Sequence, residues 1–331
     1  MVITQTPFRM SFFGGGTDFS GFFNEHGGAV LSTTFDKYAY VTVRHLPPFF
    51  DYKTHLTYSK EEKVCENSQI AHPAIRNAME WLGMSEIRMT YEADLPARSG
   101  LGTSSSFAVG MLSAFHALRG DYASKRRLAD DAIHLERVLC GEAGGIQDQI
   151  AASFGGFNRI SFSHDGYSVD PVILPPGRKK ELNERLMLFF TGFSRFSSDI
   201  HKDTEKSMKD KTRQLIEMRD LVDEAEQILT DRNASLDEFG RLLDYTWRLK
   251  RGISSGISTG SIDEQYDRAM RAGALGGKLL GAGGGGFLLF YVPEEKQDAV
   301  KKALEGQMHV PFRFENGGTK IIHYEPEEYT K

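Results

Sequence analysis

The sequence predicts an α+β protein with two domains. Its 331 residues, 40% of them hydrophobic, suffice for one large or two ordinary domains with a substantial core. Short β-rich runs and segments of helical spacing are mixed along the first half. Pro175, Pro176 and Gly177 then interrupt this pattern. We therefore place a domain junction near residue 177, with domains at 1–177 and 178–331.

The first half combines strands with helices. The β-rich runs Tyr38–Arg44 and Ile87–Tyr91 are expected to be strands. Apolar residues at helical spacing indicate four helices, at Pro73–Leu82, Ser104–Leu118, Ser124–Leu139 and Ile146–Phe154.

The second half is expected to contain long helices and a few strands. The charged stretch Arg178–Arg185 leads into the apolar run Leu186–Phe190. Two or three more strands should follow the helices, and the apolar, aromatic run Phe287–Val292 is one of them. The expected helices are Ser197–Leu229 and Leu236–Lys250, both amphipathic and rich in charge, and then Ile262–Arg271.

Composition and charge exclude several classes of protein. With 45 acidic and 40 basic residues, the net charge of −5 argues against a nucleic-acid partner. Cys65 and Cys140 lack the spacing of a zinc site or a disulfide framework, and this favours a reducing compartment. Polar residues interrupt Met1–Phe13 too often for a signal peptide, and the longest apolar runs are of strand length. We expect a cytoplasmic protein with no membrane partner.

Three glycine-rich segments dominate the sequence. They are Phe13–Asp18, Arg98–Ser106 and Gly281–Phe287. Glycine lets backbone amides approach phosphate oxygens because no Cβ intervenes. Any one of these segments alone would more often be a tight loop than a phosphate site.

The second segment is the most specific of the three. Gly100-Leu101-Gly102 is followed by four hydroxyl residues, 103–106, directly before an apolar helix. The helix dipole and the N–H groups of the first turn attract an anion, and a serine hydroxyl can ligate its magnesium ion. A merely well-capped helix would explain one of the four hydroxyl residues. This arrangement therefore suits a triphosphate.

The third segment formally matches the pattern of a dinucleotide-binding turn, G-x-G-x-x-G. Such a turn should open a helix, whereas the residues after Gly286 read as a strand. A Walker-type phosphate loop also fails, because Gly277-Lys278 is followed by Leu279. The segment needs another explanation.

Together the three segments resemble the motifs of the GHMP kinases, the family of galactokinase, homoserine, mevalonate and phosphomevalonate kinases. Pro7-Phe8-Arg9 leading to the glycines before Thr17-Asp18 resembles the first motif, and residues 96–105 and 281–286 resemble the second and third. The motifs occur in the family's order and span most of the chain. The resemblance implies a two-domain fold, with a ribosomal-S5-like N-terminal domain, a ferredoxin-like C-terminal domain and the site in the cleft between them.

The resemblance also implies cofactors, ATP and Mg²⁺, and roles for individual residues. Asp148 becomes the catalytic carboxylate, Arg9 its cationic partner, and Ser104 and Glu136 the magnesium ligands. Without the motifs, Glu136 would be read as solvated and Arg9 as half of a surface ion pair. The residues implied to bind ATP are Pro96, Ser99, Gly100, Leu101, Gly102, Thr103, Ser104, Ser105 and Ser106. Those implied to bind the substrate are Gly14, Gly15, Gly16, Thr17, Asp18, Gly145, Gly283 and Gly284.

Within the family, the amino-acid sequence around the first and third motifs is most similar to that of bacterial D-glycero-D-manno-heptose 7-phosphate kinases. This implies transfer from ATP to the anomeric hydroxyl of a sugar phosphate, giving the 1,7-bisphosphate. Galactokinases carry glutamate and histidine where this chain has Gly15 and Gly16, and their absence would make room for a phosphorylated arm. The candidate cations for that phosphate are Arg195, Lys202, Arg248, Lys250 and Arg251.

Other functions remain open at this stage. Fucokinase domains share much of the same sequence around these motifs. Some galactokinase relatives are non-catalytic sugar sensors. A decarboxylase of the same fold is a third alternative, although the Gly-Gly-Thr-Asp and Asp-Gln segments argue against it. The ten histidines show no metal-ligand spacing. The sequence also leaves open whether the chain forms a homodimer.

Overall fold

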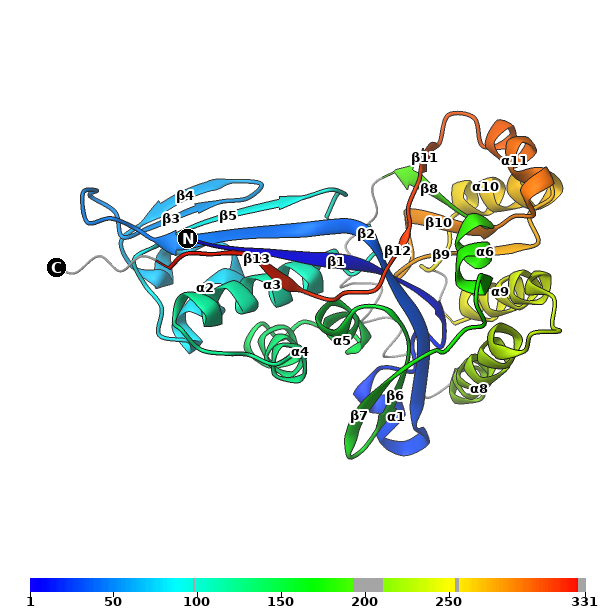
Figure 1. Ribbon diagram of the computed structural model, residues 1–331, viewed down its shortest axis with the longest axis horizontal. Coiled ribbons are helices and arrows are strands. Elements are labelled where there is room, and N and C mark those ends of the chain that lie inside the picture. Colours follow the sequence, from blue (N-terminus) through cyan, green and yellow to red (C-terminus); the bar gives the residue numbers. More distant parts are fainter. Residues whose placement is uncertain (98, 193–210, 254–255, 327–331) are drawn as a thin grey trace.

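The computed structural model describes residues 1–97, 99–192, 211–253 and 256–326, and it contains two β-sheets with helices packed on them (Figure 1). In these ranges one sheet has nine strands and the other has four. The sheets lie side by side, and the start of the first strand lies at the end of the larger sheet remote from the smaller one. The predicted mixture of helices and strands is confirmed.

Two long antiparallel strands form the centre of the larger sheet, β1 (Val2–Phe13) and β2 (Gly28–His45). Residues 28–33 of β2 pair with β6, and residues 39–45 pair with β5. The sheet runs in the order β13-β1-β2-β5-β3-β4, and β12 and β6 pair with β2 off this path, with β7 beside β6. Its other strands are β3 (Thr54–Thr57), β4 (Glu61–Val64), β5 (Ile87–Ala93), β6 (Phe157–Ser163), β7 (Gly166–Pro171), β12 (Phe314–Glu315) and β13 (Lys320–Tyr324).

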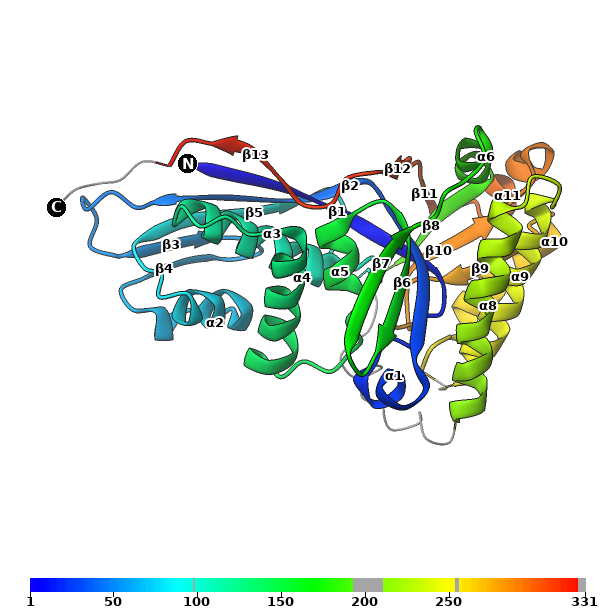
Figure 2. The ribbon, with the colours of Figure 1, turned by 60° about the horizontal axis from the view of Figure 1, so that its bottom comes forward.

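Helices α2 to α5 cover one face of this sheet (Figure 2). The central helix is α3 (Thr103–Leu118), whose residues are buried all round except at Ser104. The predicted helix of residues 124–139 is divided, because α4 (Lys125–Ile133) passes into a π-helical segment, His134–Leu139. The other helices of this part are α1 (Ser20–His26), the short η1 (Asn67–Gln69), α2 (Pro73–Trp81) and α5 (Gln147–Phe154).

The smaller sheet has the ferredoxin-like arrangement. Its strands lie in the antiparallel order β11-β8-β10-β9, and helices follow β8 and β10 in the chain, as in a β-α-β-β-α-β unit. Its strands are β8 (Leu186–Gly192), β9 (Gly276–Leu279), β10 (Gly286–Tyr291) and β11 (Met308–Val310). The helices of this half are α6 (Arg178–Glu184), α8 (Thr212–Thr230), α9 (Leu236–Arg251), α10 (Gly260–Arg271), the short η4 (Glu294–Lys296) and α11 (Gln297–Ala303).

A shared aromatic core joins the two halves. The ring of Phe12 in β1 lies 5.5 Å from that of Phe157 and 5.5 Å from that of Phe239, which belongs to α9. The end of the chain also returns to the larger sheet, where β12 and β13 pair with β2 and β1. The division at residue 177 stays a prediction, and strands from beyond it complete the larger sheet.

The predicted elements of the second half are found with shifted ends. Helix α10 begins two residues before the expected start, and β10 begins one residue before Phe287. The first residues of the expected helix Ser197–Leu229, 197–210, lie outside the described residues, and α8 covers the rest. In the described ranges, no helix has the length and apolar character needed to cross a membrane.

Candidate active site

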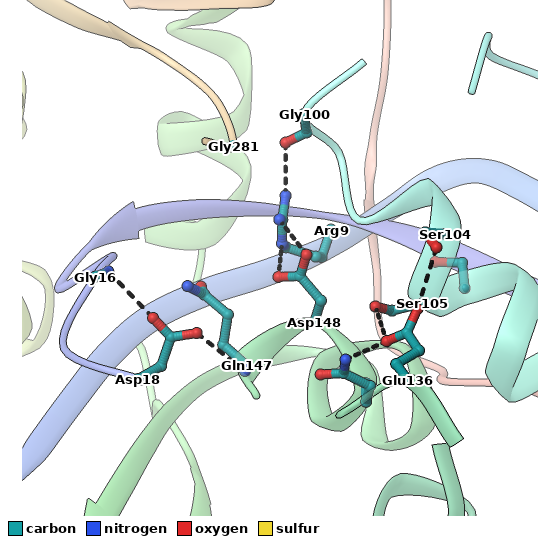
Figure 3. Close-up of polar contacts among 12 residues, drawn as sticks. Arg9, Gly16, Asp18, Gly100, Ser104, Ser105, Glu136, Gln147, Asp148 and Gly281 are labelled. Atoms are coloured by element: carbon teal, nitrogen blue, oxygen red, sulfur yellow. Dashed lines mark hydrogen bonds and ion pairs between the residues drawn. The ribbon is translucent and has the colours of Figure 1, made fainter. Parts of the chain in front are cut away.

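A bidentate ion pair joins the two residues expected to lie at the reaction centre. Arg9 Nε donates to Asp148 Oδ1 at 2.7 Å, and Arg9 Nη2 donates to Asp148 Oδ2 at 2.6 Å (Figure 3). The Arg9 side chain is 5% exposed and that of Asp148 is 25% exposed. Asp148 lies in the first turn of α5, where the helix dipole favours a negative charge. The pair therefore holds a partly open carboxylate in a fixed orientation.

Glu136 lies in the π-helical segment, and its carboxylate is almost completely buried. It accepts hydrogen bonds from Ser104 Oγ at 3.1 Å, from Ser105 Oγ at 2.8 Å and from the side-chain amide nitrogen of Gln149, Nε2. Burial raises the pKa of Glu136, although the nearby Arg137 guanidinium acts in the opposite direction. The local break in α-helical geometry is of the kind often found at functional sites.

The Ser104 and Glu136 pair fits a magnesium ion. Both residues supply the hard oxygen ligands that Mg²⁺ prefers, and Ser104 is exposed in front of the buried carboxylate. The raised pKa of Glu136 indicates that its protein neighbours do not fully compensate its charge, which a divalent cation would do. No group of three His, Cys, Asp or Glu in the described ranges could hold a metal ion. A magnesium ion here would therefore share its coordination with phosphate oxygens.

The start of α3 lies directly beside this pair. Gly102 caps the helix with φ 71°, in the left-handed region that favours glycine. A Cβ at Gly102 would lie 3.1 Å from Cγ of Arg9. Backbone N–H groups of the first helical turn have no acceptor within the helix. Residues 103–105 thus combine a helix dipole, backbone amides and hydroxyls beside the Arg9–Asp148 pair.

Other residues of the second motif serve the fold. The Ser106 hydroxyl donates to the carbonyl of Pro7 at 2.9 Å, and Leu101 is completely buried in the core. Ser99 is also buried, and Pro96 is half-buried. Arg98 lies outside the described residues. The ATP contacts expected for this stretch stay a prediction, and the side chain of Ser106 already has a partner in the protein.

Asp18 connects the first motif to the loop before Asp148. Its carboxylate accepts from the Gly16 amide at 3.1 Å and from the Gln147 amide at 3.2 Å (Figure 3). Only a glycine fits at Gly145, since a Cβ there would lie 1.9 Å from Asp18 Oδ2. Burial and then the charge of Asp148 raise the pKa of Asp18. The structure thus brings Asp18 and Gly145 together beside the reaction centre.

The glycines of the first motif differ in what they require. Thr17 Oγ1 lies 2.8 Å from the carbonyl oxygen of Gly14 and 2.9 Å from that of Ala29, so its one hydroxyl hydrogen is shared between them and closes the turn. Gly14 has φ +77°, and a Cβ there would lie 1.8 Å from the Ala29 carbonyl oxygen. A Cβ at Gly15 would meet nothing nearer than Ser11 Oγ, at 3.8 Å. Gly14 therefore serves the backbone, whereas Gly15 leaves space.

The third glycine motif packs directly on the second. A Cβ at Gly281 would lie 2.3 Å from Cα of Gly100, and a Cβ at Gly286 would lie 2.2 Å from the Ser99 carbonyl oxygen. Two backbone segments from opposite halves of the chain can approach this closely only without side chains. The motif thereby supports the loop that leads into α3.

Two glycines of the third motif were expected to contact substrate. The Gly284 amide donates to the Ile257 carbonyl at 3.0 Å, and a Cβ at Gly283 would lie 2.6 Å from Cα of Ile257. Both glycines therefore pack on the loop after α9, and contact with a sugar stays a prediction. The strand β10 begins at Gly286, as the rejection of a dinucleotide-binding turn requires.

The candidate cations for a sugar phosphate have different fates. Arg248 forms an ion pair with Asp244 at 2.7 Å, and Arg251 forms one with Asp263 at 2.9 Å. Two others, Arg195 and Lys202, lie outside the described residues.

Lys250 differs from Arg248 and Arg251 because it reaches the third glycine motif. Its Nζ donates to the carbonyl of Gly281. A second lysine, Lys278, belongs to the Gly277-Lys278 pair that does not complete a Walker-type loop. Its Nζ donates to the carbonyl of Phe12 at 2.7 Å. A lysine within the apolar run before the third motif was the sequence signal for this buried cation.

Family models match both halves of the chain. The model of the GHMP kinases N terminal domain matches residues 69–156, and that of the GHMP kinases C terminal matches residues 221–310. The chain is 31% identical over 336 residues to D-glycero-alpha-D-manno-heptose 7-phosphate kinase of Campylobacter jejuni, covering 96% of this chain and 97% of that protein. It is 29% identical to a bifunctional fucokinase/GDP-fucose pyrophosphorylase of Arabidopsis thaliana, over 64% of this chain and 21% of that protein.

Solved structures agree with this fold over nearly the whole chain. A D-glycero-D-manno-heptose 1-phosphate kinase from Bacteroides thetaiotaomicron superposes with a TM-score of 0.72 at 25% identity, covering 100% of both chains. The mevalonate kinase of Methanococcus jannaschii gives a TM-score of 0.72 at 19% identity, over 95% of this chain and 98% of that one.

Proposed function

The chain belongs to the GHMP kinase family, and on that premise we propose that it phosphorylates the anomeric hydroxyl of D-glycero-D-manno-heptose 7-phosphate, with ATP as donor. The product would be the 1,7-bisphosphate. The observation that carries the proposal is the Arg9–Asp148 pair, which lies beside the start of α3 and the buried Glu136. The choice of sugar is supported by the Campylobacter jejuni relative, which shares 31% identity over 96% of this chain.

Each part of the site has one task in the proposed reaction. Amides and hydroxyls at 103–105 hold the triphosphate, and Ser104 and Glu136 hold the magnesium ion, which when bound neutralises phosphate charge. Asp148 orients the C1 hydroxyl and accepts its proton as the new bond forms. Arg9 keeps the Asp148 carboxylate in place and stabilises developing negative charge. Positioning and charge neutralisation, the main demands of phosphoryl transfer, are thus covered.

The open space at Gly15 supports a substrate with a long, charged arm. Galactokinases carry a glutamate at this position, near the C6 end of their sugar. Within the described residues a Cβ at Gly15 would approach only Ser11 Oγ, at 3.8 Å, and position 15 itself carries no carboxylate to repel a phosphate. The position therefore provides room and removes a repulsive charge.

A panel of acceptors tests the proposal. ADP release would be measured with MgATP and heptose 7-phosphate, heptose, L-fucose, galactose and mevalonate as separate acceptors. We expect the highest kcat/KM with heptose 7-phosphate, and a product whose phosphorus NMR spectrum shows an acid-labile phosphate doublet coupled to H1. Preference for L-fucose would place the chain with the fucokinases. No ADP release with any acceptor, despite MgATP binding, would favour the non-catalytic sensor.

A further inference from the structure

Two lysines at the site have no negative partner in the described part of the chain. The printed hydrogen bond of Lys250 goes to the Gly281 carbonyl, and that of Lys278 goes to the Phe12 carbonyl at 2.7 Å. Lys278 is 3% exposed, and Lys250 is half-buried. Arg9, by contrast, is neutralised by Asp148. Burying a cation without a paired counter-charge is costly, and neither amine forms an ion pair with a carboxylate of the described residues, so both amines can take a further negative charge.

A short series of contacts connects Lys250 with the Arg9–Asp148 pair. Its ammonium group contacts Gly281, whose backbone packs on Gly100. Gly100 in turn accepts a hydrogen bond from Arg9 Nη1 at 2.8 Å, and Arg9 holds Asp148. Lys250 therefore comes from the C-terminal half of the molecule and approaches the triphosphate loop and the catalytic pair together.

The charges around Lys250 agree with this position. Burial and then the charge of Arg9 lower the pKa of Lys250 to about 8, while Asp18 and Asp148 act in the opposite direction. The pKa of Lys278 is also lowered, by burial and then by Lys250 and Arg9. Three cationic groups thus repel one another around two carboxylates. A ligand that brings several negative charges would relieve this repulsion.

We propose that Lys250 is a further catalytic residue, which donates from its ammonium group to an oxygen of the phosphoryl group in transfer. The inference rests on the proposed function only in requiring transfer from ATP to an alcohol. The bond between the terminal phosphorus and the bridging oxygen of ADP breaks, and a bond to the acceptor oxygen forms. The acceptor proton goes to Asp148, and Lys250 keeps its protons.

Nucleotide binding tests the contact without any knowledge of the sugar. Affinities for MgADP and for the imido analogue of MgATP would be measured by calorimetry for the parent protein, Lys250→Met and Arg241→Met. Arg241 lies on the same helix, more than half exposed and paired with Glu238, and serves as the matched control. We expect Lys250→Met alone to weaken the ATP analogue about 10- to 100-fold while leaving MgADP unchanged. The proposal would be overturned if Lys250→Met bound each nucleotide as tightly as the parent protein does. It would also be overturned if the variant lost affinity only for the sugar phosphate.

The pH dependence separates a charged contact from a structural one. The ammonium form is present below the pKa of about 8 and is lost as pH rises through it. kcat/KM for ATP should therefore fall above about pH 8, because this ratio reports the free enzyme. Lys250→Arg should retain activity and lose this alkaline limb, since guanidinium stays charged. If kcat/KM of an active Lys250→Arg enzyme still fell above about pH 8, the fall would belong to another titrating group, and this would contradict the role of Lys250. With an acceptor of any kind, kcat of Lys250→Met should fall about 100-fold or more.

Discussion

Asp148→Asn is the change that tests the catalytic centre most directly. The amide has the size of the carboxylate, but it cannot accept the hydroxyl proton and carries no charge for Arg9. We expect kcat to fall by about 10²- to 10⁴-fold, the usual loss when a general base is removed. That range corresponds to about 3–5 kcal/mol of activation free energy.

The same substitution should also lower the stability of the fold. Arg9 now donates to both carboxylate oxygens, at 2.7 and 2.6 Å, and an asparagine would accept from only one side. Breaking a buried ion pair costs about 3–5 kcal/mol. The cost here should be smaller, about 1–3 kcal/mol, since Asp148 is 25% exposed and Arg9 keeps its 2.8 Å bond to Gly100. The melting temperature should fall by a few degrees.

Two measurements separate these effects. Calorimetric unfolding would report the loss of the ion pair, and a coupled assay of ADP release would report turnover at saturating MgATP. Asp165→Asn, at an exposed turn, is the matched control and should change neither quantity. MgATP affinity should stay near that of the parent, because the proposed contact of Asp148 is with the acceptor hydroxyl. Near-normal turnover in a variant whose melting temperature has fallen would remove Asp148 from the mechanism.

Two further predictions concern the metal and the acceptor. Glu136→Gln keeps the side-chain size but removes the charge, so half-maximal rate should require more magnesium, and excess magnesium should partly restore it. Ser104→Ala should shift the titration in the same direction, and curves that match the parent enzyme would contradict both ligand assignments. Gly15→Glu should raise KM for heptose 7-phosphate about tenfold or more while KM for ATP changes little. The neutral Gly15→Gln separates bulk from charge, and equal losses on phosphorylated and unphosphorylated sugars would assign Gly15 to the backbone.

The order of motifs allowed much of the site to be predicted from the sequence. Arg9 and Asp148 were expected to pair, and they form two hydrogen bonds across 139 positions of sequence. Ser104 and Glu136 were likewise expected to lie together, and Ser104 Oγ donates to Glu136 Oε1 at 3.1 Å. Local patterns also located the start of α3, because left-handed glycines and hydroxyl residues at a helix start have strong sequence signals. The family resemblance supplied the pairing that local patterns cannot give.

Long-range pairing was the part that the sequence concealed. The strands β1, β6 and β7 were not predicted, and neither was the return of β12 and β13 to the first sheet. In β1 nearly every side chain is buried, so the strand shows little alternation of apolar and polar residues, and the short β12 and β13 pair with strands far away in the chain. For the same reason Lys250 was weighed as one of several helical cations. Only its contact with Gly281, 31 residues later, distinguishes it from Arg248 on the same helix turn.

The three glycine motifs form one connected group of loops around Arg9 and Asp148. Gly281 packs on Gly100, and Gly100 accepts from Arg9. Asp18 of the first motif then binds the amide of Gln147, the residue before Asp148. A shift of any one loop would therefore move the catalytic pair relative to the start of α3. Burial raises the pKa of Glu136, and Lys250 forms no ion pair within the described residues, so under the proposed function magnesium and phosphate would compensate both charges. If the proposed function holds, the bound nucleotide and metal would offset the cost of burying these groups, which the protein alone does not offset.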